Sequence, residues 1–315
     1  MMVSTLGLNE NEKTYMDSLV PNAVVHTKLD CIPDSELALI EVVISYGYDL
    51  SQDRIERMTN LKWIHIGQSG MEYLSSSLLQ ERNIQLTNSR GINASNIAEH
   101  VICAMLNHVR KTFVYRTKQL EGTWDTETRM GELRDTKLGV LGLGMAGREV
   151  VKRALAFNMH VLGMDIAPVE IEGVQHFFQP HQVKELLSIC DFVVLTMPLT
   201  KNTHHIINAE TLSVVKDGAF LINCGRGGLV DIEALKVAIA SGALAGASLD
   251  VFEKEPLEKG DELWTWNPEK LEITPHIAGD HFEAYGKRMI EVLAKNLSVY
   301  PNFDAMQNKV DIKWL

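Results

Sequence analysis

The chain has 315 residues, of which 45% are hydrophobic, and its formal net charge is −11 at pH 7. The length favours two domains with full cores, and the acidic balance argues against nucleic acid or an anionic membrane as the main partner. No apolar run approaches membrane-spanning length, and the start MMVSTLGLNENEKTY does not resemble a signal peptide. The four cysteines are scattered, without a C-x-x-C pair. We therefore expect a cytoplasmic protein with reduced thiols and no metal site.

In the first third of the chain, apolar strands alternate with helical stretches. The strands are predicted over residues 38–45, 63–66 and 85–88. Apolar residues at four-residue spacing predict a long buried helix over residues 97–113. The polar stretch 119–136 has no such pattern and is interpreted as a loop and hinge region. This alternation is typical of an α/β domain with a parallel sheet.

The run LGVLGLGMAGREV, residues 138–150, joins an apolar strand to a G-x-G-x-x-G pattern. The glycines of this pattern are Gly142, Gly144 and Gly147. The first suits a tight turn after the strand, and the second lets the backbone approach a pyrophosphate closely. The third lets the next helix pack close to the sheet. That helix begins near Met145, so its unpaired N–H groups would face the phosphates. A second strand ends at Asp165, where a dinucleotide site places its ribose-binding acid.

Further strands are predicted over residues 191–196, 219–223, 247–252 and 271–274, before a last amphipathic helix over 281–300 that we expect to return to the first domain. Three of these strands are followed by Arg226, Glu255 and His276. Taken singly, these residues have ordinary alternatives: a surface arginine on a turn, a solvated charged loop and a structural histidine. The carboxyl ends of parallel strands meet at one edge of a sheet, so the three side chains can converge there.

Together the three side chains suit hydride transfer to a ketone. A histidine can donate a proton to the ketone oxygen near neutral pH. A carboxylate beside it holds one imidazole nitrogen and favours the charged form. An arginine polarises the carbonyl group and binds the acid group of the substrate. The combination predicts a nicotinamide-dependent dehydrogenase of small keto acids.

The motifs GLGMAG, LTMPLTKNTHHIIN, LINCGRGGLVD, LDVFEKEP and ITPHIAG, in this order, resemble the D-isomer-specific 2-hydroxyacid dehydrogenase family over almost the whole chain. The chain is similar to its glyoxylate/hydroxypyruvate reductases and to the core of its phosphoglycerate dehydrogenases. The resemblance implies an α/β fold of two doubly wound parallel-sheet domains. The resemblance further implies that a Rossmann NAD-binding domain (101–281) is inserted into a flavodoxin-like substrate domain (1–100 and 282–315). It also implies a homodimer and interconversion of a small 2-keto acid and its D-2-hydroxy acid with NAD(H).

The resemblance assigns the family's catalytic Arg, Glu and His to Arg226, Glu255 and His276. The cofactor contacts it implies are Gly142, Gly144, Met145, Ala146, Gly147, Asp165, Met197, Pro198, Cys224, Arg226, Asp250 and His276. The substrate contacts it implies are Tyr46, Gly47, Ser69, Gly70, Met71 and Arg226, with core packing as the alternative for Tyr46 and Met71. Cys224 is interpreted as a packing residue and Asp250 as a partner of the nicotinamide carboxamide. The histidines expected to be structural are His100, His204 and His205.

The carboxylate of Asp165 favours NAD over NADP, because it accepts hydrogen bonds from ribose hydroxyls and would repel a 2′-phosphate. No basic residue in SYGYD, residues 45–49, could meet a substrate phosphate. This favours glyoxylate, hydroxypyruvate or pyruvate over a phosphoglycerate dehydrogenase-like activity. Asp280 and His281 stand where the family often has a small residue and threonine, which leaves the substrate open.

Two further alternatives stay open at this stage. Some relatives bind NAD but serve as corepressors that recognise peptides, so a regulatory protein with little turnover is the rival to an enzyme. Trp124 could reach across a dimer to the partner's substrate pocket, or it could pack within its own chain.

Overall fold

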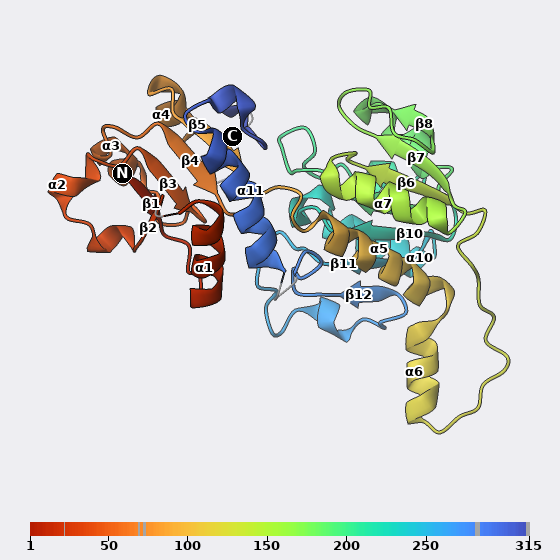
Figure 1. Ribbon diagram of the computed structural model, residues 1–315. Helices are drawn as coiled ribbons and strands as arrows, with labels where there is room; N and C mark the ends of the chain where they lie inside the picture. The colour runs from red at the N-terminus through yellow and green to blue at the C-terminus, as the bar shows by residue number, and fades with distance from the viewer. Residues whose placement is uncertain (22, 69, 72–73, 281–283, 313–315) are drawn as a thin grey trace. The chain divides into compact units, whose positions relative to one another are not determined.

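The computed structural model describes residues 1–315 except 22, 69, 72–73, 281–283 and 313–315 (Figure 1). The chain forms two compact units, of which unit 1 comprises Met1–Ile92 with His281–Leu315, and unit 2 comprises Asn93–Asp280. The first boundary lies before helix α5 (Ala94–Val109), whereas a boundary at residue 100 would cut this helix. The C-terminal segment falls in the same unit as the N-terminal one.

Unit 1 is built on a parallel five-stranded sheet with the order β2-β1-β3-β4-β5. Its strands are β1 (Met2–Ser4), β2 (Val25–His26), β3 (Val42–Ser45), β4 (Trp63–Ile66) and β5 (Gln85–Asn88). Its helices are α1 (Glu10–Leu19), α2 (Asp34–Leu37), α3 (Gln52–Arg57), α4 (Ser76–Glu81) and α11 (Tyr285–Val299). The order is that of flavodoxin-like folds, which confirms the predicted class.

Both faces of this sheet are covered, which explains why its central strands are apolar at every position. Alternate residues such as Ile44 and Trp63 pack with Met289 and Leu293 of α11. The residues between them face the opposite way, and Ile64 packs with the helices α2, α3 and α4. Packing on both faces of the sheet therefore fixes the carboxyl ends of strands β3 and β4.

Unit 2 is built on a parallel seven-stranded sheet with the order β12-β11-β10-β9-β6-β7-β8. Its strands are β6 (Lys137–Leu141), β7 (His160–Met164), β8 (Val174–Phe178), β9 (Phe192–Leu195), β10 (Ala219–Asn223), β11 (Leu244–Leu249) and β12 (Leu271–Ile273). Its helices are α5, α6 (Thr112–Leu120), α7 (Met145–Ala156), α8 (Val183–Leu187), α9 (Ala209–Leu212) and α10 (Ile232–Ser241). This is the doubly wound arrangement that the sequence predicts.

The two faces of the second sheet are covered by different helices. Helices α5 and α7 pack on one face, where Met105 and Val150 contact strand residues such as Val140. Helices α8, α9 and α10 contribute to the core on the other face, where Leu235 packs with Leu221. None of the helices in the described ranges has both the length and the apolar character needed to cross a bilayer.

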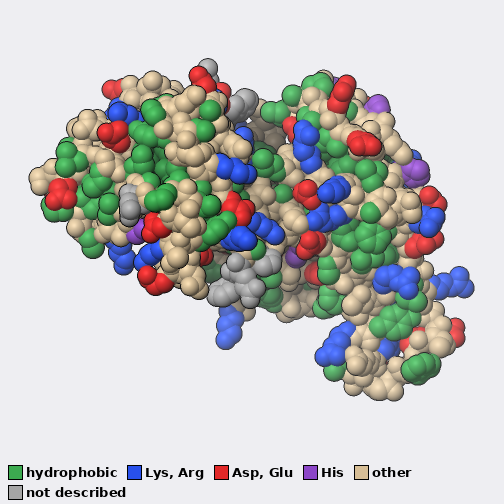
Figure 2. Space-filling view, in the orientation of Figure 1, with side chains coloured by type: hydrophobic (Ala, Val, Ile, Leu, Met, Phe, Trp, Pro, Cys, Tyr) green, Lys and Arg blue, Asp and Glu red, His purple; other side chains and the backbone are tan. Residues whose placement is uncertain are grey.

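The predicted helix over residues 97–113 is in fact two helices. Helix α5 ends at Val109, and Lys111 adopts a left-handed conformation with a φ of 54° before α6 begins. Figure 1 shows α6 and the segment after it projecting from the body of unit 2. Hydrophobic side chains lie on this projection among basic ones (Figure 2), and Trp124 is 93% exposed.

Candidate active site

The glycine-rich turn lies at the point where the strand order of unit 2 reverses. Strand β6 pairs with β7 on one side and with β9 on the other. Gly142, which follows β6, has a φ of 100°, and a Cβ there would lie 2.7 Å from the backbone nitrogen of Met197. A Cβ on Gly147 would lie 2.0 Å from the Gly142 carbonyl oxygen, so helix α7 packs directly against the turn. Ligands of doubly wound sheets bind at this kind of reversal.

The second glycine of the pattern faces open space. A Cβ on Gly144 would have no heavy atom within 4 Å, and Gly144 is the N-terminal cap of α7. Asp165 follows β7 beside the turn, where its Oδ2 accepts a 2.7 Å hydrogen bond from the backbone nitrogen of Leu143. The residues therefore fit a dinucleotide, with room for a pyrophosphate at the helix N-terminus and a carboxylate beside it for a ribose.

Arg226 follows strand β10 on a loop that is fixed by a buried amide. The Asn223 side chain donates a hydrogen bond to the Arg226 carbonyl oxygen (2.9 Å) and accepts one from the Gly225 nitrogen (3.1 Å). A Cβ on Gly227 would lie 1.9 Å from the Phe252 carbonyl carbon, so only glycine lets this loop approach the loop after β11. Arg226 is partly buried, and its Nη1 donates to the Gly225 carbonyl oxygen at 2.8 Å.

His276 and Glu255 form a hydrogen-bonded pair. The Nδ1 of His276 lies 2.7 Å from Oε2 of Glu255, although 21 residues separate them in sequence. The other carboxylate oxygen of Glu255 accepts a hydrogen bond from the Phe252 nitrogen at 2.9 Å. An ionised carboxylate only accepts hydrogen bonds, so when Glu255 is ionised Nδ1 carries the proton of this pair and Nε2 is left for other partners. The imidazole of His276 is half-exposed, so a bound molecule can reach it.

The backbone of His276 is held by Asp250, a buried carboxylate directly after strand β11. His276 has a φ of 56°, a left-handed conformation that is uncommon for residues other than glycine. The Asp250 carboxylate accepts hydrogen bonds from the nitrogens of Ile277 (2.8 Å) and Ala278 (2.9 Å) and from the Thr274 hydroxyl (2.6 Å). Asp250 thus fixes the loop that carries the histidine, a contact that the sequence analysis did not anticipate.

The other predicted cofactor contacts occupy the same edge of this sheet. Met197 follows β9 and is buried, and Pro198 beside it is exposed. Met145 and Ala146 open helix α7, with Met145 exposed. Burial, with Asp250 and Glu272 nearby, raises the pKa of the Cys224 thiol far above its usual range. A protonated thiol is a poor nucleophile, in keeping with Cys224 as a packing residue.

The predicted substrate contacts other than Arg226 belong to unit 1. Tyr46 and Gly47 follow strand β3, and burial together with Glu12 raises the pKa of Tyr46. The Gly47 nitrogen donates to the Ser45 hydroxyl at 2.7 Å. Met71 packs against the core of unit 1, and Gly70 precedes it. Ser69 and, in the C-terminal part, His281 lie outside the described residues.

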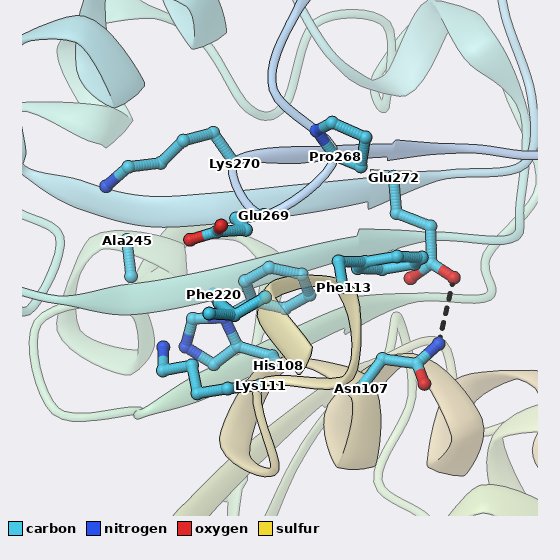
Figure 3. Close-up of a pocket in the computed structure, with 11 residues that line it drawn as sticks. Asn107, His108, Lys111, Phe113, Phe220, Ala245, Pro268, Glu269, Lys270 and Glu272 are labelled. Atoms are coloured by element: carbon cyan, nitrogen blue, oxygen red, sulfur yellow. Dashed lines mark hydrogen bonds between the residues drawn. The ribbon is translucent and has the colours of Figure 1, made fainter. Parts of the chain in front are cut away.

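A cavity of about 150 Å³ lies near the start of strands β10–β12, at the opposite edge of the second sheet (Figure 3). Asn107 donates a 3.1 Å hydrogen bond to Glu272 there, and the rings of His108 and Phe220 stack 4.3 Å apart. Burial lowers the pKa of His108 to about 4, so this ring is neutral at pH 7. The cavity contains none of the predicted site residues. It is lined by Asn107, His108, Lys111, Phe113, Val114, Phe220, Ala245, Pro268, Glu269, Lys270 and Glu272.

Glu253 is a polar residue that the sequence analysis passed over. Its Oε1 lies 2.8 Å from Nε2 of His205 and 3.4 Å from Nε2 of His204. These two histidines were expected to be structural, and Glu253 lies 48 residues after His205 in sequence. Only the doublet His-His in the loop after β9 could have signalled this group from sequence.

Comparison with known proteins extends these observations. Residues 102–278 match the sequence model described as D-isomer specific 2-hydroxyacid dehydrogenase, NAD binding domain. A hydroxypyruvate reductase of Thermotoga maritima is 33% identical over 255 residues, which are 81% of this chain and 82% of the relative. A glyoxylate reductase of Thermofilum pendens is 31% identical over 308 residues, 90% of either chain.

A solved structure resembles the chain over nearly its whole length. It is a D-lactate dehydrogenase of Aquifex aeolicus, complexed with NAD and lactic acid, with a TM-score of 0.77 and 26% identity over 98% of each chain. The family match covers more than half of this chain, and it agrees with the turn, helix and acid described above. The chain therefore belongs to the D-isomer-specific 2-hydroxyacid dehydrogenase family, and unit 2 carries that family's NAD-binding domain.

Proposed function

We propose that this protein interconverts a small unphosphorylated 2-keto acid and its D-2-hydroxy acid, with His276 as the general acid and base. The observation that carries the proposal is the 2.7 Å pair of His276 and Glu255, on loops at the edge of the sheet where the glycine-rich turn also lies. NADH, when bound, supplies the hydride for the reduction. His276 supplies the proton to the carbonyl oxygen, and Glu255 holds Nδ1 so that Nε2 is the atom that exchanges the proton.

Arg226 is proposed to bind and orient the substrate. Its guanidinium can donate two parallel hydrogen bonds to a carboxylate, and it polarises a carbonyl oxygen. Its loop abuts the loop of Glu255 through the contact at Gly227, so the arginine is held in a fixed relation to the His276–Glu255 pair. The assignments of Tyr46, Gly47, Ser69, Gly70 and Met71 to the substrate stay predictions.

We propose glyoxylate, hydroxypyruvate or pyruvate as the substrate class. The relatives named hydroxypyruvate reductase and glyoxylate reductase support this class, as does the absence of a basic residue in SYGYD. Pockets discriminate a methylene or hydroxyl group by roughly 1–3 kcal/mol, so turnover of more than one of these acids is expected. The reaction is expected in the cytoplasm.

The preference for NAD over NADP is assigned to Asp165. Its carboxylate already accepts hydrogen bonds from the nitrogens of Leu143 and Ile166, which fixes it beside the turn. A 2′-phosphate would place a second negative charge against it. We expect Asp165→Ala to narrow the ratio of kcat/KM for NADH over NADPH at least tenfold. A wild-type enzyme that prefers NADPH would contradict this assignment.

We also propose that the protein is a homodimer. Helix α6 has no buried residue, and the segment after it exposes Trp124 almost completely. Exposed apolar side chains gathered on one projection are typical of a surface that another chain covers. The Discussion gives the test of this proposal.

The experiment that tests the function is NADH oxidation with a panel of 2-keto acids, including a phosphorylated one. Wild type is compared with His276→Ala, Glu255→Gln and the surface variant His181→Ala. General acid catalysis contributes about 10²–10⁴-fold, so His276→Ala should lose that much in kcat/KM while His181→Ala stays at the wild-type rate. NADH binding is measured separately for each variant.

Each outcome bears on a different part of the proposal. If a phosphorylated acid is the best substrate, the substrate class is wrong and a phosphoglycerate dehydrogenase-like activity replaces it. If no keto acid is turned over while NADH still binds tightly, the protein is a NAD-binding regulator or a corepressor. If His276→Ala keeps full activity, the catalytic assignment fails.

A further inference from the structure

A cluster of three metal-ligating side chains lies outside the residues assigned to catalysis. Within the described part of the chain, the donor atoms of His204, His205 and Glu253 all lie within 4.8 Å of one another. The two imidazole rings are stacked with centroids 3.9 Å apart, and the Nε2 atoms of His204 and His205 lie 3.4 Å and 2.8 Å from the same oxygen, Oε1 of Glu253. Three donors converge on one small volume at a surface that water and ions can reach.

The two histidines are held in place by the backbone of their loop. The His204 nitrogen donates to the Thr200 carbonyl oxygen at 2.9 Å, and the His205 nitrogen donates to the Gly228 carbonyl oxygen at 2.8 Å. The His205 carbonyl oxygen accepts a hydrogen bond from the Asn208 side chain at 2.8 Å. His205 also has a left-handed φ of 48°, a conformation that persists only where the surroundings enforce it. These hydrogen bonds therefore fix the backbone of both histidines.

Glu253 is brought to the histidines by the same close packing that positions Arg226. A Cβ on Gly227 would lie 2.2 Å from the Glu253 nitrogen, so the two loops are in direct contact. A Cβ on Gly228 would lie 3.5 Å from Oε1 of Glu253, which places the carboxylate over that glycine. The carboxylate of Glu253 thus lies on the loop after β11, whereas the two histidines lie on the loop after β9.

From this geometry we propose that His204, His205 and Glu253 bind a divalent transition-metal ion such as Zn²⁺. Two imidazole nitrogens and one carboxylate oxygen form a typical three-ligand zinc set, with water completing the tetrahedron. Bonds of about 2.0–2.1 Å place neighbouring ligand atoms of a tetrahedron about 3.4 Å apart. The 3.4 Å separation of His204 and Glu253 fits this value, and the 2.8 Å separation of His205 and Glu253 must widen by about half an ångström.

The alternative to a metal site is a pair of imidazole N–H groups that share one carboxylate oxygen. The two cases differ in the state of Nε2, since a metal ion needs its lone pair and a hydrogen bond needs its proton. A metal ion would join the loop after β9 to the loop after β11, two residues before Glu255. Metal binding itself does not depend on the proposed function, so either can fail without the other.

The test is a zinc titration of tag-free protein that has first been stripped with a chelator. Calorimetry should show one saturable zinc ion per chain in wild type and in the control His181→Ala, which alters an exposed histidine elsewhere in unit 2. His204→Ala and Glu253→Gln should each raise the Kd at least tenfold. Co²⁺ in place of zinc should give the visible absorption of a nitrogen–oxygen tetrahedral site, and the variants should lose it.

The variants are compared with wild type by thermal unfolding in the chelator, where no metal contributes. Glu253→Gln keeps the shape of the side chain, so its Tm there should equal that of wild type, and only wild type should gain Tm when zinc is added. The proposal is overturned if wild type shows no saturable zinc binding. It is also overturned if His204→Ala and Glu253→Gln bind zinc as tightly as His181→Ala.

Discussion

Asp250 is a buried carboxylate whose side-chain hydrogen bonds go to residues on either side of His276. The left-handed conformation of His276 is unfavourable for a side chain with a Cβ, so something in the fold must enforce it. The Asp250 carboxylate enforces it by accepting hydrogen bonds from the backbone nitrogens of Ile277 and Ala278, because both bonds form only when His276 has the observed conformation. Asp250 acts here through His276, as a positioning residue.

We expect Asp250→Asn to lower kcat about 10- to 100-fold, because a displaced general acid loses much of its effect. In the variant, the asparagine amide would turn an N–H group toward one of the two backbone N–H groups. In wild type that backbone N–H donates to a carboxylate oxygen of Asp250. Thr274→Val is the matched control, since it removes only the 2.6 Å bond and leaves both backbone bonds. The measurement is steady-state kinetics with a separate NADH titration. Loss of NADH affinity with unchanged kcat would instead support a contact of Asp250 with the nicotinamide carboxamide.

His65 couples the stability of unit 1 to pH. It is fully buried in strand β4, where its ring nitrogens lie 2.8 Å from the Thr87 hydroxyl and 3.1 Å from the Ser89 hydroxyl. Burial lowers the pKa of His65 from 6.5 to about 3. Between these values the unfolded chain binds a proton here that the folded chain does not. The free energy of unfolding must therefore fall as the pH falls through this window.

We expect His65→Gln to reduce this pH dependence. Glutamine keeps hydrogen-bonding groups at the site and does not ionise. Between about pH 6.5 and pH 5, wild type should lose about 1.5 kcal/mol more of its free energy of unfolding than the variant. Urea unfolding at both pH values measures the difference, with the exposed His181→Gln as the control. Equal losses in wild type and His65→Gln would show that burial does not lower the pKa of His65 in the folded protein.

At the scale of elements, the sequence predicts most of the strands that are buried on both faces. Strands β3, β4 and β9 read as apolar runs and were found within a few residues. Strand β8 was missed because its middle residues Gln175 and His176 are exposed, so it has no apolar run. Strand β2 has only two residues, too few for any periodicity. The break between α5 and α6 was missed because the apolar spacing continues across it.

The candidate site shows the same division between local and long-range information. The glycine-rich turn and Asp165 lie within one strand–helix–strand unit, so the sequence pattern locates them. The residues Arg226, Glu255 and His276 were proposed from their positions after strands and their motifs, and their catalytic roles stay predictions. The sequence analysis missed the hydrogen bonds from the loop of His276 to Asp250, and it missed the contact of Glu253 with His205. Both depend on how loops from different strands pack, which no local pattern reports.

The contact of helix α7 with its turn gives a matched pair of substitutions. In Gly147→Ala, the new Cβ would meet the Gly142 carbonyl oxygen at 2.0 Å, so the helix must move and we expect a loss of several degrees in Tm. In Gly144→Ala, the new Cβ meets nothing within 4 Å, and the Tm should stay at the wild-type value. NADH affinity should nevertheless fall at least tenfold in Gly144→Ala, because the methyl group occupies space that a pyrophosphate needs.

Thermal unfolding and an NADH titration distinguish the two effects. Fluorescence titration should give a raised Kd for Gly144→Ala without a change in its unfolding curve. A wild-type Kd in this variant would mean that the cofactor does not approach the turn at Gly144. An unchanged Tm in Gly147→Ala would mean that α7 can shift without loss of packing.

At the scale of the whole molecule, the projection formed by α6 and the segment after it exposes apolar side chains. Helix α6 has no buried residue, and Leu120 and Trp124 are 73% and 93% exposed. An isolated helix of nine residues is marginal in water, so α6 needs tertiary contacts to persist. Within its own unit, the described residues supply few of them. A second copy of the chain that covers the projection would bury these side chains and stabilise the helix.

We therefore expect sedimentation to give twice the chain mass of 35.3 kDa for wild type. Leu120→Glu and Trp124→Glu place a charge where the proposed interface excludes water, so each should shift the equilibrium toward the single chain and lower the Tm. Val237→Glu is the control, because Val237 is also exposed, at 68%, but lies on α10 away from the projection. If all three variants sediment as wild type does, the projection is not an interface. If wild type itself sediments as a single chain, α6 must be stabilised without a partner and the dimer proposal is wrong.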